Sequence, residues 1–163
     1  MAPKSIGVSS LCRRQGIKIL SADEYKSLKK NNKMKFLGQG GQGQCWRLRG
    51  MGKDWVVKES KDDLEHEIRH LDKVKGLPGV QKIVAFCPDK NVLITKYAGR
   101  CILEFLMKNP KCAISLLRQL TGIILCMTSN GVYHNDIKRD NVCVRQDGTD
   151  LRVTLIDFGL AST

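Results

Sequence analysis

The sequence lacks several features that would place it outside the cell or in a membrane. Its seven cysteines are an odd, dispersed set in which no two form a C-x-x-C pair. Such a set favours reduced thiols over a disulfide framework. No apolar run approaches the roughly 18 residues of a membrane span. Residues 1–11 lack the apolar segment of a secretory signal. These absences predict an intracellular protein, cytoplasmic or nuclear, with no membrane span.

Acidic residues are scarce, 16 against 28 lysines and arginines, and the basic excess is uneven. Residues 1–35 hold nine basic residues against only Asp23 and Glu24. A basic leader of this kind can contact nucleic acid, an anionic membrane or an acidic partner, or can be a solvated arm. Aromatic residues make up 6% of the chain, and only Tyr25 is interleaved with the basic residues. Any nucleic-acid contact is therefore expected only through residues 1–35, without base stacking.

What is present fits one globular domain: 163 residues, 42% of them hydrophobic, with no internal repeat or low-complexity stretch. We interpret residues 1–32 as a basic, partly disordered leader that contains a short helix at 22–30, capped by Ser21. Short strands are predicted near 33–38, 43–49, 54–58, 82–86 and 91–97, and an amphipathic helix at 61–75. Helices at 102–108 and 111–129 and a hairpin of 142–144 with 152–156 follow. Strands first and helices later indicate an α+β fold.

Three glycines, Gly38, Gly40 and Gly43, lie between two predicted strands. Glycine lets the backbone approach a polyphosphate and present N–H groups to it. The spacing also occurs in dinucleotide-binding turns, which need a helix after the glycines, and here a strand follows. A glycine-rich hairpin with no ligand is the plain alternative. Lys58 ends the next apolar strand and could reach a phosphate, and Glu67 on the following helix could hold Lys58 by an ion pair.

The segment 133–141 and the later Asp157-Phe158-Gly159 carry the strongest chemical pattern. Phosphoryl transfer depends on positioning and charge neutralisation more than on covalent chemistry. Asp136 is suited to orient an attacking hydroxyl and accept its proton, and Lys138 to neutralise the γ-phosphate. Asn141 and Asp157 supply hard oxygen ligands that suit magnesium. This order of residues predicts a site for ATP and Mg²⁺.

On these motifs the chain resembles the eukaryotic protein kinase family from about residue 33 onward. His134 to Asn141 is similar to H-R-D-L-K-x-x-N, Val56-Val57-Lys58 to the V-A-I-K strand, and Asp157-Phe158-Gly159 to D-F-G. Lys138 is typical of the serine/threonine branch. The resemblance implies a five-stranded antiparallel N-lobe with helix αC over 33–98 and a partial helical C-lobe over 99–163.

The same resemblance implies roles for individual residues. The catalytic residues would be Asp136, Lys138, Lys58 and Glu67, and the metal ligands Asn141 and Asp157. Nucleotide contacts would come from one set of residues: Leu37, Gly38, Gly40, Gly43, Cys45, Lys58, Thr95 and Tyr97. The implied activity is transfer of the γ-phosphate of ATP to a Ser/Thr hydroxyl of a protein substrate.

The sequence departs from the family pattern in three places. Asn135 replaces the H-R-D arginine, so activation through a loop phosphate is not expected. Only nine positions separate Lys58 from Glu67, which makes Glu65 a fallback partner. The resemblance is truncated shortly after the D-F-G motif, and most of the C-lobe is absent. We therefore expect an apolar surface for a partner or self-association, formed by Ile114, Leu117, Ile123, Ile124 and Leu125.

Two other functions remain open from the sequence. The chain could be a non-catalytic kinase-like module that binds nucleotide and regulates a partner. His66-Glu67-Ile68-Arg69-His70 also fits H-E-x-x-H, which places two imidazoles on one helical face as in zinc proteases. The third ligand that a zinc site needs is not evident; Glu104 is a possible ligand, with nothing to recommend it specifically.

Overall fold

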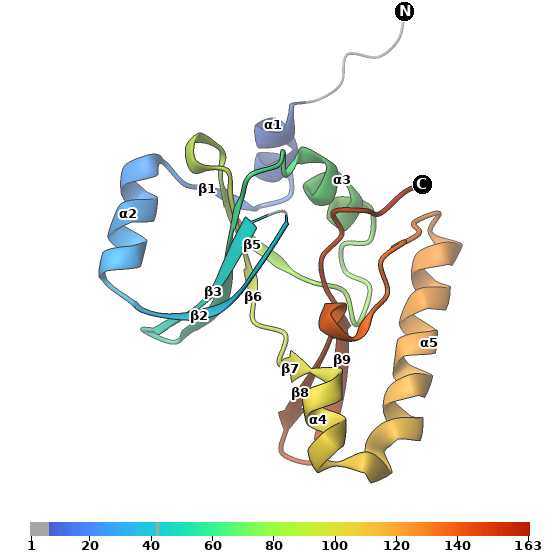
Figure 1. The fold of residues 1–163 in the computed structure, drawn as a ribbon. Helices are drawn as coiled ribbons and strands as arrows, with labels where there is room; N and C mark the ends of the chain where they lie inside the picture. The colour runs from blue at the N-terminus through green and yellow to red at the C-terminus, as the bar shows by residue number, and fades with distance from the viewer. Residues whose placement is uncertain (1–6, 42) are drawn as a thin grey trace, which may run out of the picture. The chain divides into compact units, whose positions relative to one another are not determined.

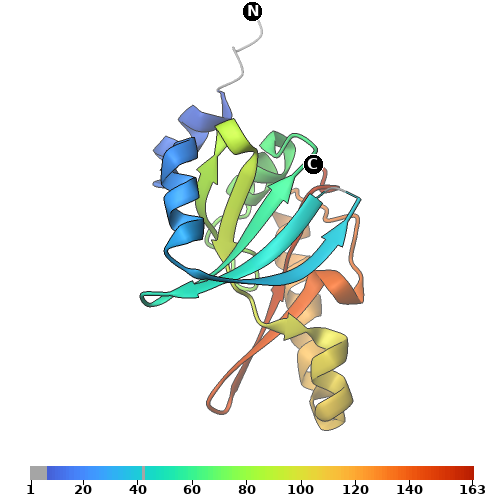
Figure 2. The same ribbon diagram turned by 60° about the vertical axis from the view of Figure 1, so that its left-hand side comes forward.

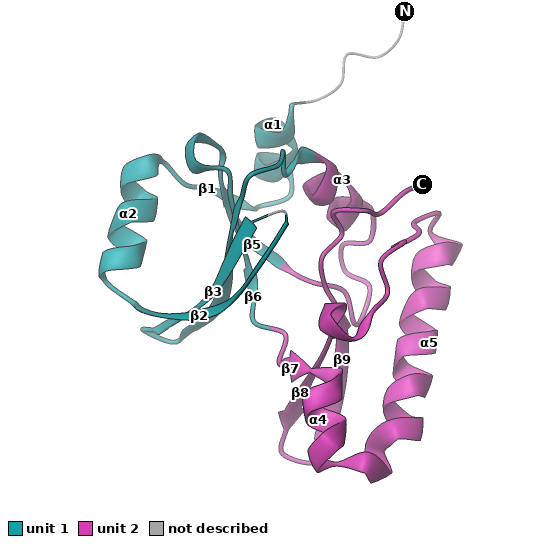
Figure 3. Ribbon diagram, viewed as in Figure 1, with its two compact units in different colours: residues 1–65, 83–97 teal, residues 66–82, 98–163 magenta. Residues whose placement is uncertain are grey.

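Two units make up the chain, and the structure, a computed structural model, describes residues 7–41 and 43–163. One unit consists of Met1–Glu65 with Ile83–Tyr97, and the other of His66–Lys82 with Ala98–Thr163 (Figure 3). Each unit has its own sheet and helices, whose order along the chain can be followed in Figure 1. This mixture of helices and a multi-stranded sheet agrees with the predicted α+β class and fits a kinase-like fold.

The first unit is built on a six-stranded sheet in the order β1-β5-β6-β4-β3-β2. Its strands are β1 (Lys18–Ile19), β2 (Lys33–Gly40), β3 (Gly43–Gly50), β4 (Lys53–Ser60), β5 (Ile83–Cys87) and β6 (Val92–Lys96). Strands β2 to β6 pair antiparallel with one another and lie where the sequence predicts them. β1 pairs parallel to β5, so the sheet has one strand more than the five predicted. β1 is only two residues long, too short for an alternating pattern to reveal it.

The predicted basic leader is part of this unit over residues 7–32. It forms α1 (Val8–Arg14), β1 and α2 (Ala22–Lys30), while residues 1–6 lie outside the described part. Ser21 caps α2 as predicted: its side chain accepts from the Glu24 N–H at 3.2 Å, and the Glu24 carboxylate accepts from the Ser21 N–H at 2.8 Å. This reciprocal pair satisfies two backbone donors at the start of the helix. Residues 7–32 thus contain two helices and a strand, where the sequence predicts one short helix.

One face of the six-stranded sheet carries the core of the first unit, and α2 covers that face (Figure 2). Tyr25 of α2 is buried among side chains that alternate along the strands, and Leu28 packs against them. The buried set is Leu20, Tyr25, Leu48, Val57, Ala85, Cys87, Val92 and Ile94. Burial of each large apolar side chain contributes about 1.5–3 kcal/mol. Because successive strand residues point to opposite faces, Lys58 and Thr95 belong to the other face of the sheet.

The second unit contains a three-stranded sheet in the order β7-β8-β9, with helices beside it. Its elements are α3 (Glu65–Lys73, in this unit from His66 onward), β7 (Arg100–Cys101), α4 (Ile102–Lys108), α5 (Ala113–Ser129), β8 (Val142–Asp147) and β9 (Asp150–Leu155). The predicted hairpin is present as β8 and β9, and both strands extend further toward the turn that joins them than predicted. Helix α4 has its predicted bounds, and 3-10 turns precede α5 at Pro110–Cys112 and β8 at Arg139–Asn141.

Helix α3 begins four residues later than predicted, because side chains hold Asp62 outside the helix. The Ser60 hydroxyl accepts from the Asp62 N–H at 3.2 Å, and Asn91 Nδ2 donates to the Asp62 carbonyl at 2.6 Å. The Asp63 carboxylate then accepts from the Glu65 N–H at 2.9 Å, where the helix starts. Side-chain bonds of this kind compete with helix formation at its first turn.

Helix α5 packs on β9 with one side only. Gln119 donates to the Leu151 carbonyl at 3.0 Å and accepts from the Val153 N–H at 3.1 Å. Ile123 is buried, contrary to the expectation, because it fills the space beside Gly79: a Cβ on that glycine would lie 2.2 Å from Ile123 Cδ1. Ile124 is half-buried.

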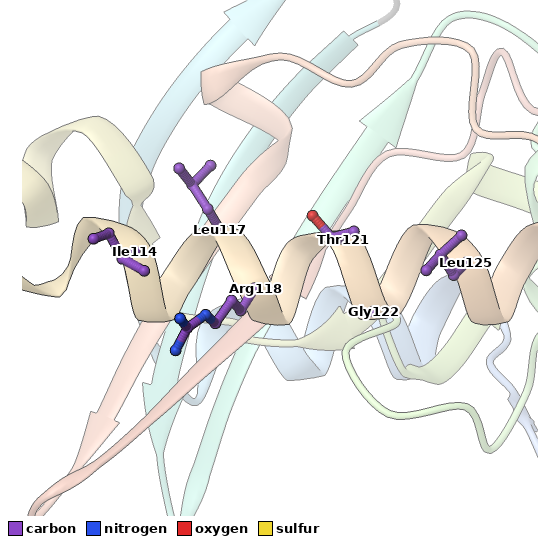
Figure 4. Close-up of a pocket in the computed structure, with 6 residues that line it drawn as sticks. All are labelled: Ile114, Leu117, Arg118, Thr121, Gly122 and Leu125. Atoms are coloured by element: carbon purple, nitrogen blue, oxygen red, sulfur yellow. The ribbon is translucent and has the colours of Figure 1, made fainter.

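The opposite side of α5 is the apolar surface that the sequence predicts. Ile114, Leu117 and Leu125 are 66%, 56% and 62% exposed. Figure 4 shows these three residues on α5 together with Arg118, Thr121 and Gly122. The six residues line a groove of about 440 Å³.

The 20 residues Pro110–Ser129 are long and apolar enough to cross a membrane, judged by length and composition. This departs from the expectation that no apolar run approaches that length. A single such helix is weak evidence for a span, because the core helix of a soluble protein satisfies the same criteria. Only 17% of its most apolar window is buried within the protein, so most of this helix surface faces outward.

Candidate active site

The second unit brings Asp136, Lys138 and Asn141 together in the segment between α5 and β8. Asp136 Oδ2 accepts from Lys138 Nζ at 2.8 Å and from Asn141 Nδ2 at 2.9 Å. Asn141 Nδ2 also donates to the Asp136 carbonyl at 2.9 Å, and the 3-10 turn Arg139–Asn141 supplies the bend that brings the amide back. Three of the residues predicted for catalysis or metal binding therefore form one hydrogen-bonded cluster.

The Asp136–Lys138 contact keeps both groups charged. The hydrogen bond from Lys138 lowers the pKa of Asp136, and the carboxylate in turn raises the pKa of Lys138. The two side chains are 23% and 52% exposed, so solvent reaches both. Because Asp136 is ionised, its carboxylate can accept a proton. Because Lys138 is protonated, its ammonium group can face an anion.

His134 is a structural link in this segment. It is 3% exposed, and its Nδ1 accepts from the Asp136 N–H at 3.2 Å. Nε2 therefore carries the proton and donates to the Ile156 carbonyl at 2.9 Å, which makes the ring neutral. Burial lowers the pKa of His134, in keeping with that neutral state. Phe158, fully buried, lies edge-on to the His134 ring at 4.7 Å between centroids.

Asp157 follows β9 in a left-handed conformation, with φ of 64°. Its N–H donates to Gln81 Oε1 at 2.9 Å, and the N–H of the preceding Ile156 donates to the Asn141 carbonyl at 2.9 Å. Sequence reasoning did not single out Gln81, whose partner lies 76 positions away. The hydrogen bond between Ile156 and Asn141 thus links one predicted metal ligand, Asn141, to the residue that precedes the other, Asp157.

Asn141 and Asp157 have the ligand chemistry that a magnesium ion prefers. Asn141 is 5% exposed and spends both donors of its amide nitrogen on Asp136, which leaves Oδ1 as its acceptor. An amide oxygen and a carboxylate are hard ligands, and Mg²⁺ takes few protein ligands beside water and phosphate oxygens.

The predicted phosphate-binding loop is the β2–β3 hairpin of the first unit, where Gly40 pairs with Gly43; Gln42 lies outside the described residues. Gly43 has φ of 150°, and a Cβ there would lie 2.1 Å from the Glu59 carbonyl oxygen. A register shift between Phe36 and Gly38 falls at Leu37 and gives the strand an irregularity just before the loop.

The other predicted nucleotide contacts share the sheet face opposite α2. Cys45 pairs with Lys58, which pairs with Leu93, and Val56 pairs with Thr95. Thr95 is 2% exposed. Strand alternation therefore places Gly38, Cys45, Lys58 and Thr95 on one surface of the first unit.

Tyr97 takes part in a contact that the sequence does not reveal. The Arg47 guanidinium lies 3.5 Å from the centre of the Tyr97 ring, and two hydrogen bonds of 2.8 and 2.9 Å join it to Asp54. The bidentate bond to Asp54 raises the pKa of Arg47. The Arg47 guanidinium, stacked on the Tyr97 ring, thus holds Tyr97 just after the end of β6.

Lys58 and Glu67 belong to different units, so their ion pair stays a prediction. The alternative pairing of Lys58 with Glu65 also stays a prediction. Glu67 lies on α3 and is 2% exposed. A buried glutamate on a helix is the position expected of a residue that holds a lysine, because buried charges are rarely left without compensation.

The zinc-protease interpretation of the H-E-x-x-H segment is not supported. His66 Nε2 lies 2.7 Å from the Ala161 carbonyl, and His70 Nδ1 lies 2.8 Å from the His66 carbonyl. Across residues 7–41 and 43–163, no three His, Cys, Asp or Glu side chains gather as a metal site, so Glu104 does not complete one. The two imidazoles instead satisfy backbone carbonyls.

No protein-family model matches the chain. Among curated proteins, it is 27% identical to a calcium-dependent protein kinase 26 of Oryza sativa subsp. japonica over 111 residues, 64% of this chain and 20% of that protein. It is 23% identical to a calcium-dependent protein kinase 4 of Plasmodium falciparum, over 91% of this chain and 30% of that protein. It is 26% identical to a calcium/calmodulin-dependent protein kinase type 1 of Caenorhabditis briggsae, over 74% of this chain and 35% of that protein.

The matched stretch thus spans a fifth to about a third of these relatives. Distant and partial as they are, these similarities support a relationship of the chain to the protein kinases.

Proposed function

We propose that the chain is a serine/threonine-type protein kinase domain that binds ATP with magnesium and transfers the γ-phosphate to a protein hydroxyl. The observation that carries this proposal is the cluster in which Asp136 Oδ2 receives both Lys138 Nζ and Asn141 Nδ2. A carboxylate, a cation and an oriented amide in one turn of chain match the needs of phosphoryl transfer. The kinase relatives support the same class of reaction.

In this proposal the cluster divides the chemistry between two side chains. The substrate hydroxyl oxygen forms a bond to the γ-phosphorus as the bond from that phosphorus to the bridging oxygen of ADP breaks. Asp136 orients the hydroxyl and takes its proton, and Lys138 neutralises charge on the γ-phosphate oxygens. Asn141 and Asp157 would hold Mg²⁺, which supplies charge neutralisation for the phosphates when bound.

The nucleotide would occupy the sheet face opposite α2. Gly38, Gly40 and Gly43 would let the hairpin backbone approach the phosphates, and Lys58, held by Glu67, would contact them. Leu37, Cys45, Thr95 and Tyr97 would surround the base. The support is that Gly38, Cys45, Lys58 and Thr95 share that one face by strand register.

A regulatory module that binds nucleotide without turnover is the second candidate, and the exposed apolar side of α5 favours it. Ile114, Leu117 and Leu125 offer a surface that a protein partner or a second copy would cover. We place the protein inside the cell, cytoplasmic or nuclear, because its seven cysteines are odd in number and dispersed along the sequence.

A paired measurement tests the proposal: magnesium-dependent ATP affinity, and phosphate transfer to a generic basic protein. Lys58→Met should weaken productive nucleotide placement, and Asp157→Ala should abolish the magnesium dependence of binding. Nucleotide binding in both variants equal to that of the unchanged chain would refute the site. Binding without any transfer by the unchanged chain would favour the regulatory module.

A further inference from the structure

A basic cavity lies in the first unit on the α2 side of the sheet, with a volume of about 490 Å³. Four lysines line it: Lys26 and Lys29 from α2, Lys61 after β4, and Lys90 from the 3-10 turn Pro88–Lys90. Of the described residues that line the cavity, one is acidic, Glu59 of β4. This volume lies within the range of pockets that enclose small ligands, about 300–1,000 Å³.

The charge of Glu59 is already compensated inside the cavity. Its Oε1 accepts from the Tyr25 hydroxyl and from Lys29 Nζ, the latter at 2.8 Å. Burial pushes the pKa of Glu59 up, but the bonds from Lys29 and Tyr25 outweigh burial and leave its pKa lowered. Burial and the same carboxylate raise the pKa of Tyr25, which therefore stays a neutral donor. Glu59 and Lys29 thus form a neutral pair in the cavity wall.

Among the residues that the structure describes, the three other lysines have no acidic partner in the cavity wall. Lys26 contacts Asp23 at 3.4 Å, but these side chains are 69% and 91% exposed, so solvent screens the pair strongly. Lys61 and Lys90 are exposed, at the rim. Clustered cations in a concave site raise the local concentration of anions.

The cavity and the proposed nucleotide site lie on opposite faces of the sheet. Glu59 and Lys58 are consecutive on β4 and point to opposite faces of the sheet, as do Gln44 of the cavity wall and Cys45. A ligand in the cavity therefore lies on the α2 face, opposite Cys45 and Lys58, and Gly43 of the β2–β3 hairpin is the residue that lines the cavity and is also proposed to approach ATP.

We propose that this cavity binds a small ligand with two or more clustered phosphate groups. Lysine ammonium groups act as point charges that suit phosphate oxygens, and several arranged around one space favour a ligand of high charge density. Lys29 is held in place by Glu59 and lies 5.5 and 5.4 Å from the ring centres of Tyr25 and Trp46. Trp46 is thus positioned to report on occupancy through its fluorescence.

The test measures binding of inositol hexakisphosphate to the full chain by calorimetry in about 0.15 M salt, near physiological ionic strength. It is run with and without saturating MgATP, so that it does not depend on the nucleotide site. The Lys61→Ala/Lys90→Ala variant should bind at least 10-fold more weakly. The matched control Lys33→Ala/Lys35→Ala removes the same charge from the exposed strand β2 and should change affinity less than 2-fold.

Equal weakening in the two double variants would overturn the proposal, because it would mean that the probe responds only to the net charge of +12. Absence of binding to the unchanged chain would overturn it as well. Displacement of the probe by MgATP would also do so, by assigning the probe to the nucleotide site. Because Lys61 and Lys90 are exposed, a thermal melt of the variant should match that of the unchanged chain.

A second arm identifies the source of the phosphates. Vesicles of phosphatidylcholine with phosphatidylinositol bisphosphate present the same chemistry on a lipid headgroup. Vesicle binding that is lost in Lys61→Ala/Lys90→Ala supports a headgroup, and binding of the free probe alone supports a soluble ligand. Vesicle binding unchanged by the substitutions, together with no binding of the free probe, would contradict a site in this cavity.

Discussion

Asn135 Nδ2 donates to Ser162 Oγ at 2.9 Å and to the Leu160 carbonyl at 3.1 Å, so one amide holds the segment that follows the D-F-G-like residues. Asn135 has φ of 62°, a left-handed conformation that asparagine tolerates better than most residues. Tyr133 and Ser162 exchange two backbone hydrogen bonds beside it, of 2.9 and 2.8 Å. At the position where the kinase pattern has arginine, the neutral Asn135 side chain holds Leu160 and Ser162 by hydrogen bonds that do not involve a phosphate.

Asn135→Gly tests these side-chain hydrogen bonds, because glycine tolerates the left-handed backbone conformation and removes the side-chain amide. We expect faster hydrogen exchange at the Ser162 amide, with a loss of about 1–2 kcal/mol of local protection. Asn130→Asp is the control, since it removes a similar side-chain bond, to the Cys126 carbonyl, at the end of α5. Unchanged exchange at Ser162 in Asn135→Gly would mean that the backbone pairing with Tyr133 suffices.

Lys138→Met should raise the pKa of Asp136 toward the ordinary aspartate value of 3.8. Lys138 is the main cause of the depression, so its stabilising effect is complete above pH 3.8 and is lost as the pH falls through the lower pKa of the folded protein. A carbon-detected NMR titration of the Asp136 carboxyl measures the shift. Lys108→Met, on the exposed surface of α4, should leave that titration in place. An unshifted Asp136 in Lys138→Met would contradict the cause assigned to its pKa.

Substitutions at two glycines of the β2–β3 hairpin should have different effects on stability and on ligand binding. Gly43→Ala should cost about 1–3 kcal/mol of stability, because its φ is 150° and the new Cβ would meet the Glu59 carbonyl. Gly40→Ala meets nothing within 4 Å, so it should leave the melting temperature nearly unchanged and weaken ATP binding alone. Thermal melts and ATP titrations of both variants check this. An equal melting-temperature loss in the two would contradict the contact described for Gly43.

The sequence predicted the elements whose evidence is local. The cap at Ser21 needs only Glu24 three positions on, and strands β2 to β6 show their alternation within a few residues. Asp136, Lys138 and Asn141 come together because they lie within six positions of the chain.

The features that the sequence did not predict depend on residues that lie far apart along the chain. β1 exists through pairing with β5, more than 60 positions away, and has only two residues of its own. Ile123 was expected to be exposed, but Gly79 leaves the space that buries it. The Arg47–Tyr97 stack and the bond from the Asp157 N–H to Gln81 likewise join residues that no local pattern connects.

The most direct test of the central claim compares Asp136→Asn with the unchanged chain in two assays on the same preparations. Phosphate transfer from radiolabelled ATP to a basic protein should fall at least about 100-fold, because the amide cannot take the hydroxyl proton. The affinity for MgATP should stay within about 2-fold, since Asp136 acts on the hydroxyl and not on nucleotide binding. Equal transfer by the two proteins, or none by either with intact nucleotide binding, would contradict the account.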